Sequence, residues 1–205
     1  MAFLSADSMQ DRETVLSLNT RCQSKSRDMY RLHPRGIEAF RINWTINNVE
    51  GKVLDIGCAD GLIATLIARK GYEIVGIDVV PEVLENARNF LKEEPEEVQK
   101  KVTFQEVWAE ELPFFTDSFD TVILAETLEH VSDPFKTLKE AHRVLAKGGK
   151  LILTVPKGYR PFASHFRHYT EESIKEQVGK IFEQVDVIDT NGKALRWIYV
   201  IAQKR

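Results

Sequence analysis

Short runs of apolar residues alternate along this chain with stretches in which apolar residues recur every three or four positions. The runs predict strands and the recurring pattern predicts amphipathic helices, because side chains repeat every 2 residues in a strand and every 3.6 in a helix. The predicted strands cover residues 52–56, 73–78, 102–107, 119–125 and 150–155, and the predicted helices cover 36–47, 62–70, 81–91, 134–147 and 170–179. Strands separated by helices are typical of an α/β fold whose mostly parallel sheet has helices on both faces.

The end of the chain follows a different pattern. Residues 182–189 and 195–202 predict two strands on either side of Asn191-Gly192, a pair of residues typical of tight hairpins. We therefore expect a C-terminal antiparallel hairpin beside the parallel strands. We find no repeat or linker that divides the chain, so we expect one domain over residues 1–205 with its catalytic core in 51–205. Residues 1–35 are polar and lack a strand pattern, and we expect them to form an N-terminal lid.

The first predicted strand ends in a glycine-containing turn with the spacing Gly57-x-Ala59-x-Gly61. A dinucleotide fingerprint would place a third glycine after Gly61, and this chain lacks it. Asp55 points a carboxylate at the mouth of this turn, which matches an ammonium or sulfonium group better than a pyrophosphate. Asp78 closes the second strand at the distance where an acidic residue takes ribose hydroxyls. The predicted ligand is a nucleoside with a cationic tail.

From this turn onward the chain resembles the class I S-adenosylmethionine-dependent methyltransferases of the type 11-like kind. The resemblance rests on motifs in the family's order at residues 53–61, 76–78, 109–114, 128–134 and 143–149. It implies a Rossmann-like, seven-stranded sheet, S-adenosylmethionine as the cofactor and S-adenosylhomocysteine as the product. The residues that it places around the cofactor are Asp55, Gly57, Cys58, Ala59, Gly61, Asp78, Val79, Trp108, Ala109 and Glu126. Trp108 stands where the family often has an acid, so we expect it either to stack on the adenine or to belong to the core.

Glu126, Glu129 and His130 form a spacing that would bring them to one face of a helix. Two carboxylates and an imidazole suit Mg²⁺ or Mn²⁺. The pattern also resembles the metal-binding motif of ubiquinone-pathway O-methyltransferases and of small-RNA 2′-O-methyltransferases, where a downstream histidine completes the site. His168 or His165 would take that place here. We favour the metal-free reading, in which His130 or His168 is a general base, because Leu-Glu-His-Val is widespread in the wider family.

Residues 157–169 follow the fifth predicted strand and should contribute to the site that holds the methyl acceptor. Arg160 and Arg167 in this segment favour an anionic acceptor, and the aromatic residues Tyr159, Phe162 and Phe166 favour a planar one. We expect the acceptor to be a small molecule.

Charge, cysteine content and the first residues of the chain indicate the cellular setting of the protein. The net charge of −3 at pH 7 and the pI of about 6.0 give no overall field that would recruit nucleic acid or a membrane. Cys22 and Cys58 are the chain's two cysteines, which argues against a disulfide framework. The first residues lack the basic and apolar segments of a signal peptide. We expect a cytoplasmic monomer or homodimer.

Three functions follow from these observations. The leading one is O-methylation of a small molecule by in-line methyl transfer. The second is metal-assisted 2′-O-methylation of RNA, which the charge disfavours. The third is a protein that binds S-adenosylmethionine without catalysis, as a sensor or subunit.

Overall fold

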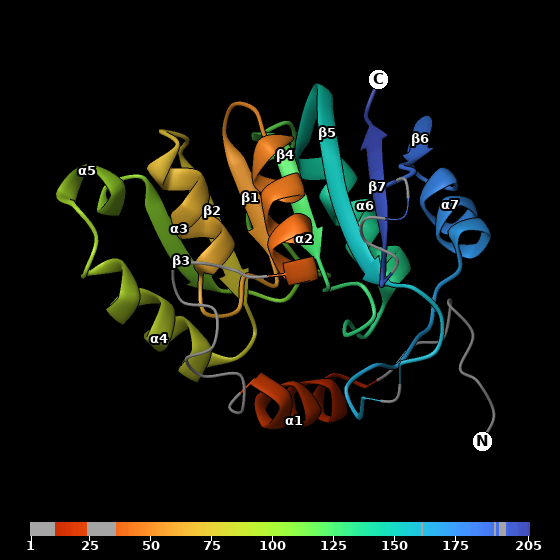
Figure 1. The fold of residues 1–205 in the computed structure, drawn as a ribbon, viewed down its shortest axis with the longest axis horizontal. Coiled ribbons are helices and arrows are strands. Elements are labelled where there is room, and N and C mark those ends of the chain that lie inside the picture. Colours follow the sequence, from red (N-terminus) through yellow and green to blue (C-terminus); the bar gives the residue numbers. More distant parts are fainter. Residues whose placement is uncertain (1–10, 24–35, 161, 191, 193–195) are drawn as a thin grey trace.

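The computed structural model describes residues 11–23, 36–160, 162–190, 192 and 196–205. In this part of the chain, one sheet of seven strands has the order β3-β2-β1-β4-β5-β7-β6 (Figure 1). The strands are β1 (Val53–Ile56), β2 (Ile74–Asp78), β3 (Val102–Glu106), β4 (Phe119–Ala125), β5 (Leu145–Pro156), β6 (Gln184–Val187) and β7 (Trp197–Gln203). The pairs among β1 to β5 are parallel, and β7 is antiparallel to both β5 and β6. The predicted α/β fold with its antiparallel C-terminal strands is confirmed.

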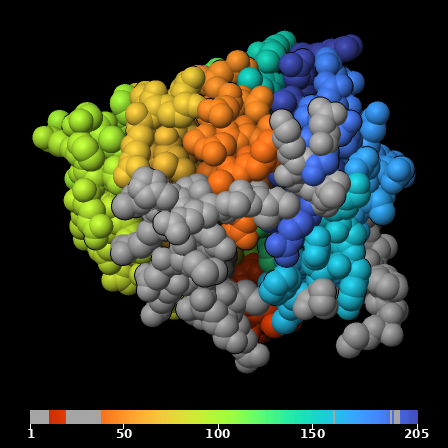
Figure 2. All heavy atoms as spheres, in the orientation of Figure 1, coloured from red at the N-terminus to blue at the C-terminus, as the bar shows by residue number. Residues whose placement is uncertain are grey.

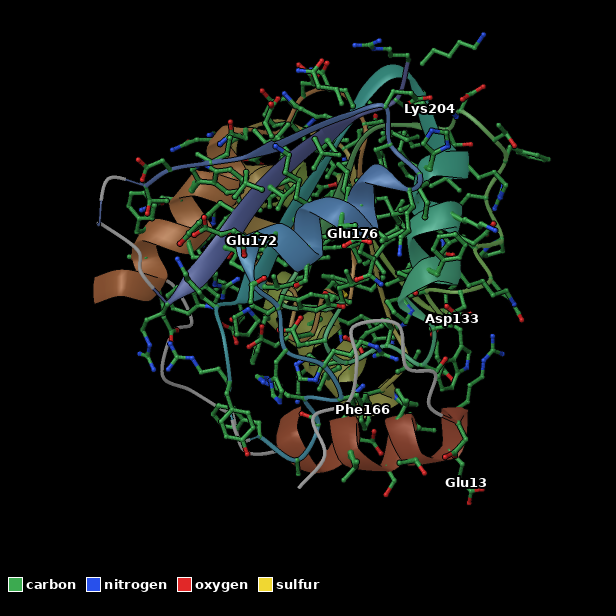
Figure 3. The ribbon with its side chains drawn as sticks, turned by 90° about the vertical axis from the view of Figure 1, so that its right-hand side faces the viewer. Glu13, Asp133, Phe166, Glu172, Glu176 and Lys204 are labelled. Carbon is green, nitrogen blue, oxygen red and sulfur yellow. The ribbon has the colours of Figure 1, made fainter. Side chains whose placement is uncertain are left out.

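Helices cover both faces of the sheet. They are α1 (Arg12–Gln23), α2 (Gly36–Asn47), α3 (Leu62–Arg69), α4 (Pro81–Leu91), α5 (Glu96–Gln99), α6 (Pro134–Val144) and α7 (Glu171–Gly179). In Figure 1, α2 and α3 lie in front of the sheet and α6 lies behind it. Figure 3 shows Glu172 and Glu176 on α7, and both residues are exposed. None of the helices in the described ranges is long and apolar enough to span a membrane.

Alternation along the strands divides the core into two layers. Val53 and Ile123 face the layer formed with α2, α3 and α4, whereas their neighbours Leu54 and Leu124 face the layer formed with α6 and α7. All four side chains are fully buried. Burial of one such side chain contributes about 1.5–3 kcal/mol, so the central strands fix the position of every loop that leaves them.

The predicted helix limits need one correction. The helix predicted to run to Gly148-Gly149 ends at Val144, and the chain enters β5 at once at Leu145. Leu145 pairs with Phe119 across a register shift in β4. Gly149 allows this close pairing, because a Cβ there would lie 2.8 Å from the carbonyl oxygen of Asp120. The glycine pair therefore belongs to the strand.

The carboxyl ends of the parallel strands point toward α1, which lies across that end of the sheet in Figures 1 and 3. In the order of the strands, β1 and β4 are neighbours in the sheet but distant in sequence, and the chain leaves β1 in one direction and β4 in the other. Ligands of α/β sheets bind at such a switch point.

Candidate functional site

A cavity of about 910 Å³ lies at the carboxyl ends of the parallel strands. Its wall combines the loops that follow β1, β2, β3, β4 and β5 with parts of α1, α2 and β7. Of the residues expected around the cofactor, those that line the cavity are Asp55, Gly57, Cys58, Ala59, Asp78, Val79, Trp108, Ala109 and Glu126. Figure 2 shows α1 (red) at the lower edge, beside the cyan segment that follows β5.

The turn after β1 is held in an unusual backbone conformation. Gly57 has φ 77° and Ala59 has φ 47°, both in the left-handed region. The amides of Gly57 and Cys58 donate to the carbonyl of Ile77 in β2, at 2.8 and 2.9 Å. A Cβ at Gly57 would lie 2.6 Å from the Thr127 side chain. The turn is therefore fixed by β2 on one side and by the chain after β4 on the other.

Gly61 has a different role from the one expected. It does not line the cavity, whose described wall passes from Asp60 to Leu62. A Cβ at Gly61 would lie 2.5 Å from Cζ of Phe104 and 3.0 Å from Cβ of Ala87. We conclude that this glycine lets α3 begin close against the sheet.

Two buried carboxylates stand at the floor of the cavity. Asp78 accepts hydrogen bonds from the amides of Ala59 and Val80, each at 3.0 Å. Asp55 is 1% exposed, and its Oδ2 has no hydrogen-bond partner among the described residues. Burial, and secondarily the charge of Asp78, raises the pKa of Asp55 to about 7. Burial makes the ionised form of Asp55 unfavourable, and a cationic group placed beside it would stabilise that form. This fits the cationic tail inferred from the sequence.

Two cavity residues need separate comment. The thiol of Cys58 has its pKa raised well above the ordinary value by burial and by Asp55, so it stays protonated and is not a nucleophile. Trp108 is half-buried and lines the cavity, and the guanidinium of Arg12 lies 4.9 Å from the centre of its ring. Arg12 in α1 also pairs with Glu111 at 2.9 Å. Trp108 thus connects α1 to the cavity wall.

Glu126 does not share a helical face with Glu129 and His130. The residue has φ 56°, and the chain makes a single turn, closed by a hydrogen bond from the amide of His130 to the carbonyl of Thr127. Its carboxylate lies 3.5 Å from the guanidinium of Arg41 and accepts a hydrogen bond from the indole of Trp197. The stretch is not helical, so the condition under which the three residues would share one face is not met.

A second cluster gathers on the acceptor side. Within the described ranges, Glu129, His130 and His165 bring potential ligand atoms within 4.8 Å of one another. Glu129 is 0% exposed, and neither of its carboxylate oxygens has a hydrogen-bond partner in the described part of the chain. Burial, and then the charge of Glu126, raises the pKa of Glu129 well above its ordinary value. A buried carboxyl group without a partner calls for an explanation, and a bound ion is one.

The ring of His130 has a defined orientation. Its Nδ1 lies 2.8 Å from the carbonyl oxygen of Ser164, so Nδ1 must donate and Nε2 carries the lone pair in the neutral ring. Nε2 lies 4.0 Å from Glu129. Burial, and then His165, lowers the pKa of His130 to about 4. The ring is therefore neutral throughout the physiological pH range, not titrating near its reference value of about 6.5.

His168, the other expected catalytic histidine, lies elsewhere. It is absent from the described cavity lining and from the cluster, and its ring packs edge-on against Tyr159 with centroids 4.8 Å apart. His165 takes the place considered for either residue, with its ring edge-on to His130 at 4.8 Å. The two histidines are three positions apart in an irregular loop, and the path of that loop places His165, not His168, next to His130.

The acceptor side also differs from the expectation in its arginines. Arg167 is 1% exposed and does not appear in the described lining of the cavity. Arg160 and Arg196 line the cavity together with Phe162, which is 63% exposed. Arg160 comes from the loop after β5, Arg196 immediately precedes β7, and Arg41 of α2 also lines the cavity.

Three contributors to the cavity were not among the predicted site residues. Trp197 comes from a strand with an ordinary apolar pattern, whereas Arg41 ends a locally basic segment, residues 21–41, that is interpreted as a solvated helix face or, alternatively, as a positively charged lid over an anionic substrate. The third is α1, whose Val15, Leu18 and Asn19 line the cavity. Val15 is 2% exposed, so α1 packs over the site as the expected lid would; residues 1–10 and 24–35 of that expected lid lie outside the described residues. The sequence signals were the polar segment ahead of the first strand, for α1, and the basic segment 21–41, for Arg41.

Comparison with known proteins bears on these observations. The family profile described as "Methyltransferase domain" matches residues 54–153. The ubiquinone biosynthesis O-methyltransferase of Pseudomonas aeruginosa is 36% identical over 131 residues, which cover 60% of this chain and 55% of the relative. The chain thus spans about half the length of the curated relatives it matches.

Solved structures share the fold at lower identity. A SAM-dependent methyltransferase from Thermotoga maritima has a TM-score of 0.66 and 21% identity, covering 83% of this chain and 90% of that one. The [4+2]-cyclase SpnF has a TM-score of 0.68 and 19% identity, covering 81% and 80%. Since the second protein is described as a cyclase, the fold alone does not decide the reaction. The matched profile assigns residues 54–153 to a methyltransferase domain, and the curated relatives and the fold support a class I S-adenosylmethionine-dependent methyltransferase.

Proposed function

We propose that this chain transfers a methyl group from S-adenosylmethionine to an oxygen of a small, planar, anionic molecule. The observation that carries the proposal is the division of one cavity into two sides. One side holds Asp55, the Gly57 turn and Asp78, which suit a nucleoside with a cationic tail. The other is lined by His130 and His165 beside the cations Arg160 and Arg196, which suit a hydroxyl on an anionic acceptor, and the buried Glu129 has a carboxylate oxygen within 4.8 Å of both imidazoles.

The protein's work in such a reaction is mainly alignment. The sulfonium is already an activated leaving group, so catalysis consists of holding the acceptor oxygen, the methyl carbon and the sulfur in line. The lone pair on Nε2 of His130 is available to accept a hydrogen bond from the acceptor hydroxyl. With a pKa of about 4, His130 is a weak base, so the ring orients the hydroxyl more effectively than it removes the proton.

The acceptor is tested in two steps. Methyl-labelled S-adenosylmethionine is incubated with the protein and fractionated cell extract, and we expect label in the small-molecule fraction. The second step uses 3,4-dihydroxybenzoate as a probe, because it combines a ring, a carboxylate and hydroxyl groups. Label in the RNA fraction would favour RNA 2′-O-methylation, and cofactor binding with no labelled fraction would favour a non-catalytic binding protein.

A second candidate is the same methyl transfer assisted by a divalent cation. It is supported by the unpartnered, fully buried carboxyl group of Glu129 beside two imidazoles. Replacing Glu126 with His165 in the ligand set leaves one carboxylate and two imidazoles, which suits Mn²⁺ better than Mg²⁺. Glu129, His130 and His165 would hold the ion. When bound, the ion supplies a Lewis acid that lowers the pKa of the acceptor hydroxyl.

The metal candidate is checked by titrating Mn²⁺ and Mg²⁺ into chelator-treated protein in a calorimeter. We expect Mn²⁺ to bind more tightly, and Glu129→Gln to weaken that binding. The matched control is Glu111→Gln, which changes a carboxylate outside the cavity that pairs with Arg12 and Lys136. Absence of Mn²⁺ binding together with full labelling of 3,4-dihydroxybenzoate in chelator would reject the metal and leave the first proposal intact.

The oligomeric state and the cytoplasmic setting expected from the sequence stay predictions. An acceptor of low molecular weight is in keeping with the curated relatives, which are named O-methyltransferases of ubiquinone biosynthesis.

A further inference from the structure

Two segments distant in sequence are joined beside the acceptor side of the cavity. The first is the turn that follows β4, and the second is the loop between β5 and α7. The amide of Phe166 donates to the carbonyl of Glu129 at 3.0 Å, and the ring of His130 donates to the carbonyl of Ser164 at 2.8 Å. His130, which lines the cavity, and the buried Glu129 beside it are thus both tied to the loop.

Arg167 adds two further bonds from the same loop. Its Nη1 donates to the carbonyl of Val131 at 2.5 Å and its Nη2 donates to the carbonyl of Ser132 at 2.8 Å. The residue is 1% exposed. A guanidinium has the fixed fork that two adjacent carbonyls require, and burying such a charge is costly unless it is well hydrogen-bonded. Arg167 is therefore built into the protein and not directed at a ligand.

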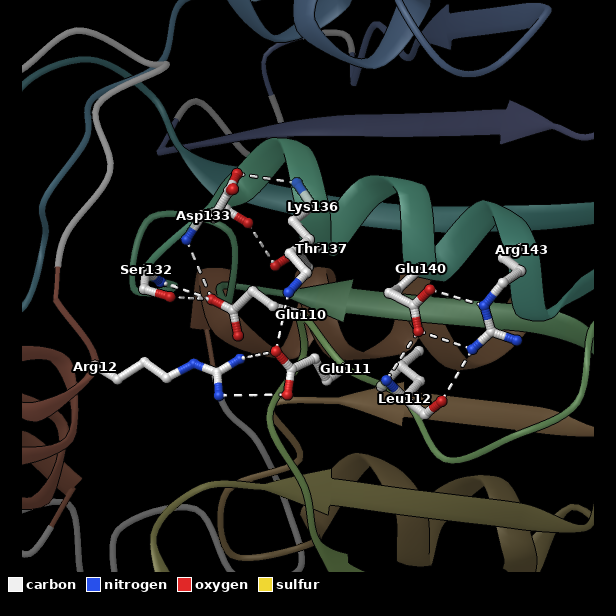
Figure 4. Close-up of polar contacts among 10 residues, drawn as sticks. All are labelled: Arg12, Glu110, Glu111, Leu112, Ser132, Asp133, Lys136, Thr137, Glu140 and Arg143. Carbon is white, nitrogen blue, oxygen red and sulfur yellow. Dashed lines mark hydrogen bonds and ion pairs between the residues drawn. The ribbon is translucent and has the colours of Figure 1, made fainter.

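Glu110 holds the same turn from the opposite side. Its Oε1 accepts hydrogen bonds from the amide and the hydroxyl of Ser132, at 2.9 and 2.5 Å, and from the amide of Asp133 at 3.1 Å (Figure 4). Glu110 is 2% exposed. Ser132 is thus fixed through its amide by a buried anion and through its carbonyl by a buried cation.

The turn needs such external support. It begins at Glu126 in the left-handed region, and the backbone bond from the amide of His130 to Thr127 closes a single turn, not a helix. The carboxyl group of Glu129 has no side-chain partner among the described residues, so its direction is set by the backbone. A small movement of the turn would redirect both Glu129 and His130.

We infer that Arg167 and Glu110 are positioning residues, which hold the turn so that His130 faces the acceptor with the buried Glu129 beside it. This inference rests on the proposed function. Neither residue is itself proposed as a catalytic group. Arg167 acts through the carbonyls of Val131 and Ser132, and Glu110 acts through the amides of Ser132 and Asp133. Removal of Arg167, which is absent from the described lining of the cavity, should lower turnover while leaving the cofactor side undisturbed, whereas Glu110 lines the cavity next to Trp108 and Ala109.

The test compares Arg167→Met with Arg143→Met. Arg143 also donates to two backbone carbonyls, those of Leu112 and Phe114, but it lies near the far end of α6 and away from the cavity (Figure 4). For Arg167→Met we expect turnover of 3,4-dihydroxybenzoate to fall by about a hundredfold, the loss that a misplacement of about 1 Å can produce. Calorimetric affinity for S-adenosylhomocysteine should stay within about twofold of the parent, since mutation removes no cofactor contact. Arg143→Met should keep the turnover of the parent.

A spectroscopic readout separates positioning from general loss of stability. In protein with ¹⁵N-labelled histidine and bound S-adenosylhomocysteine, the parent should show His130 as the Nδ1-protonated tautomer, with the signal assigned by its loss in His130→Gln. Arg167→Met should give a tautomer mixture, whereas Arg143→Met should keep the parent signal. Arg167→Lys keeps the charge without the fork and should recover part of both the signal and the turnover.

The outcomes distinguish the two claims. Parent-like His130 signals in Arg167→Met, or equal losses in Arg143→Met, would overturn the positioning role. If Arg167→Met does not fold, Arg167→Lys decides, and parent-like signals with parent-like turnover in that variant would overturn it as well. If the parent methylates no acceptor while Arg167→Met still alters the His130 tautomer, the proposed function fails and the positioning role stands.

Discussion

The two sides of the cavity differ in how their polar groups are satisfied. On the cofactor side, both oxygens of Asp78 accept backbone amides, and the Gly57 turn is bonded to β2. On the acceptor side, both oxygens of Glu129 and Nδ1 of His165 have no hydrogen-bond partner among the described residues. Apart from Asp55, whose Oδ2 also lacks a partner in the described part of the chain, the first side is preorganised by the chain itself. The second side has buried polar groups that a ligand would satisfy. Until a ligand binds, these unpaired groups lower the stability of the protein.

The largest effect should come from Gly57→Ala, which disrupts the preorganised cofactor side of the cavity. The new Cβ would meet Thr127 at 2.6 Å in a residue with φ 77°. Left-handed strain costs about 1–3 kcal/mol and the steric clash costs about as much again. We expect calorimetry to detect no binding of S-adenosylhomocysteine.

The matched control for this variant is Gly71→Ala. Gly71 has φ 96°, and its Cβ would meet nothing within 4 Å, so it carries the backbone strain without the clash. Cofactor affinity should survive in Gly71→Ala. Equal loss in both variants would mean that general destabilisation, not the shape of the turn, explains the result.

On the acceptor side of the cavity, Glu129→Met should raise the stability of the protein while lowering its turnover. A buried unpaired group costs about 1–3 kcal/mol, so removing it should raise the melting temperature by a few degrees in metal-free buffer. Turnover of 3,4-dihydroxybenzoate should fall by at least about tenfold, because the carboxyl group that lies 4.0 Å from Nε2 of His130 is lost. Glu111→Met, at an exposed carboxylate, should leave turnover unchanged and not raise the melting temperature. A lower melting temperature for Glu129→Met would show that its carboxyl group already has a stabilising partner.

A pH effect of intermediate size should come from Asp55. Its pKa of about 7 means that the free protein carries a proton there below neutral pH, which a cationic ligand must displace. Affinity for S-adenosylhomocysteine should therefore fall by up to about tenfold per unit as the pH drops below 7. The raised pKa of Asp55 has the opposite effect on the stability of the ligand-free fold. The contribution of Asp55 to stability is present below its unfolded-state pKa of about 3.9 and is lost as the pH rises through about 7.

The ligand 5′-methylthioadenosine provides the control, because it lacks the charged amino-acid tail. Its affinity should be nearly independent of pH, as should that of S-adenosylhomocysteine for Asp55→Asn. A steep pH dependence that persists in Asp55→Asn would assign the proton to another group.

The smallest effect should come from Arg12→Ala, which loosens α1. The pair with Glu111 is exposed and contributes about 0.2–1 kcal/mol, and the contact with Trp108 contributes about 0.5–1 kcal/mol. We expect cofactor affinity to fall by no more than about fivefold, and limited proteolysis within α1 to become faster. Bound S-adenosylhomocysteine should slow that cleavage in the parent. Equal cleavage of the parent with and without ligand would contradict the proposed lid.

The sequence predicted most of the fold because strands and helices depend on local patterns. The limits of α2 and β4 match the predicted ranges, and the Gly57 turn could be found because strand, glycine and helix are adjacent. The acceptor side depends on long-range geometry instead. The positive φ of Glu126 turns its carboxylate toward Arg41 and Trp197, and no spacing rule reveals that. His165 and His168 have equivalent patterns, and only the path of the folded loop decides which one reaches His130.

The position of β7 has a consequence for how the protein is made. This strand lies between β5 and β6, yet it comes last of the seven along the chain. Its first residue, Trp197, holds the carboxylate of Glu126, which was synthesised about seventy residues earlier. On the ribosome, the cofactor loop can therefore form while the sheet still lacks an interior strand, and the acceptor side must wait for the final insertion. A nascent chain released before that point would bury its nucleotide turn but leave Glu126 without its indole partner.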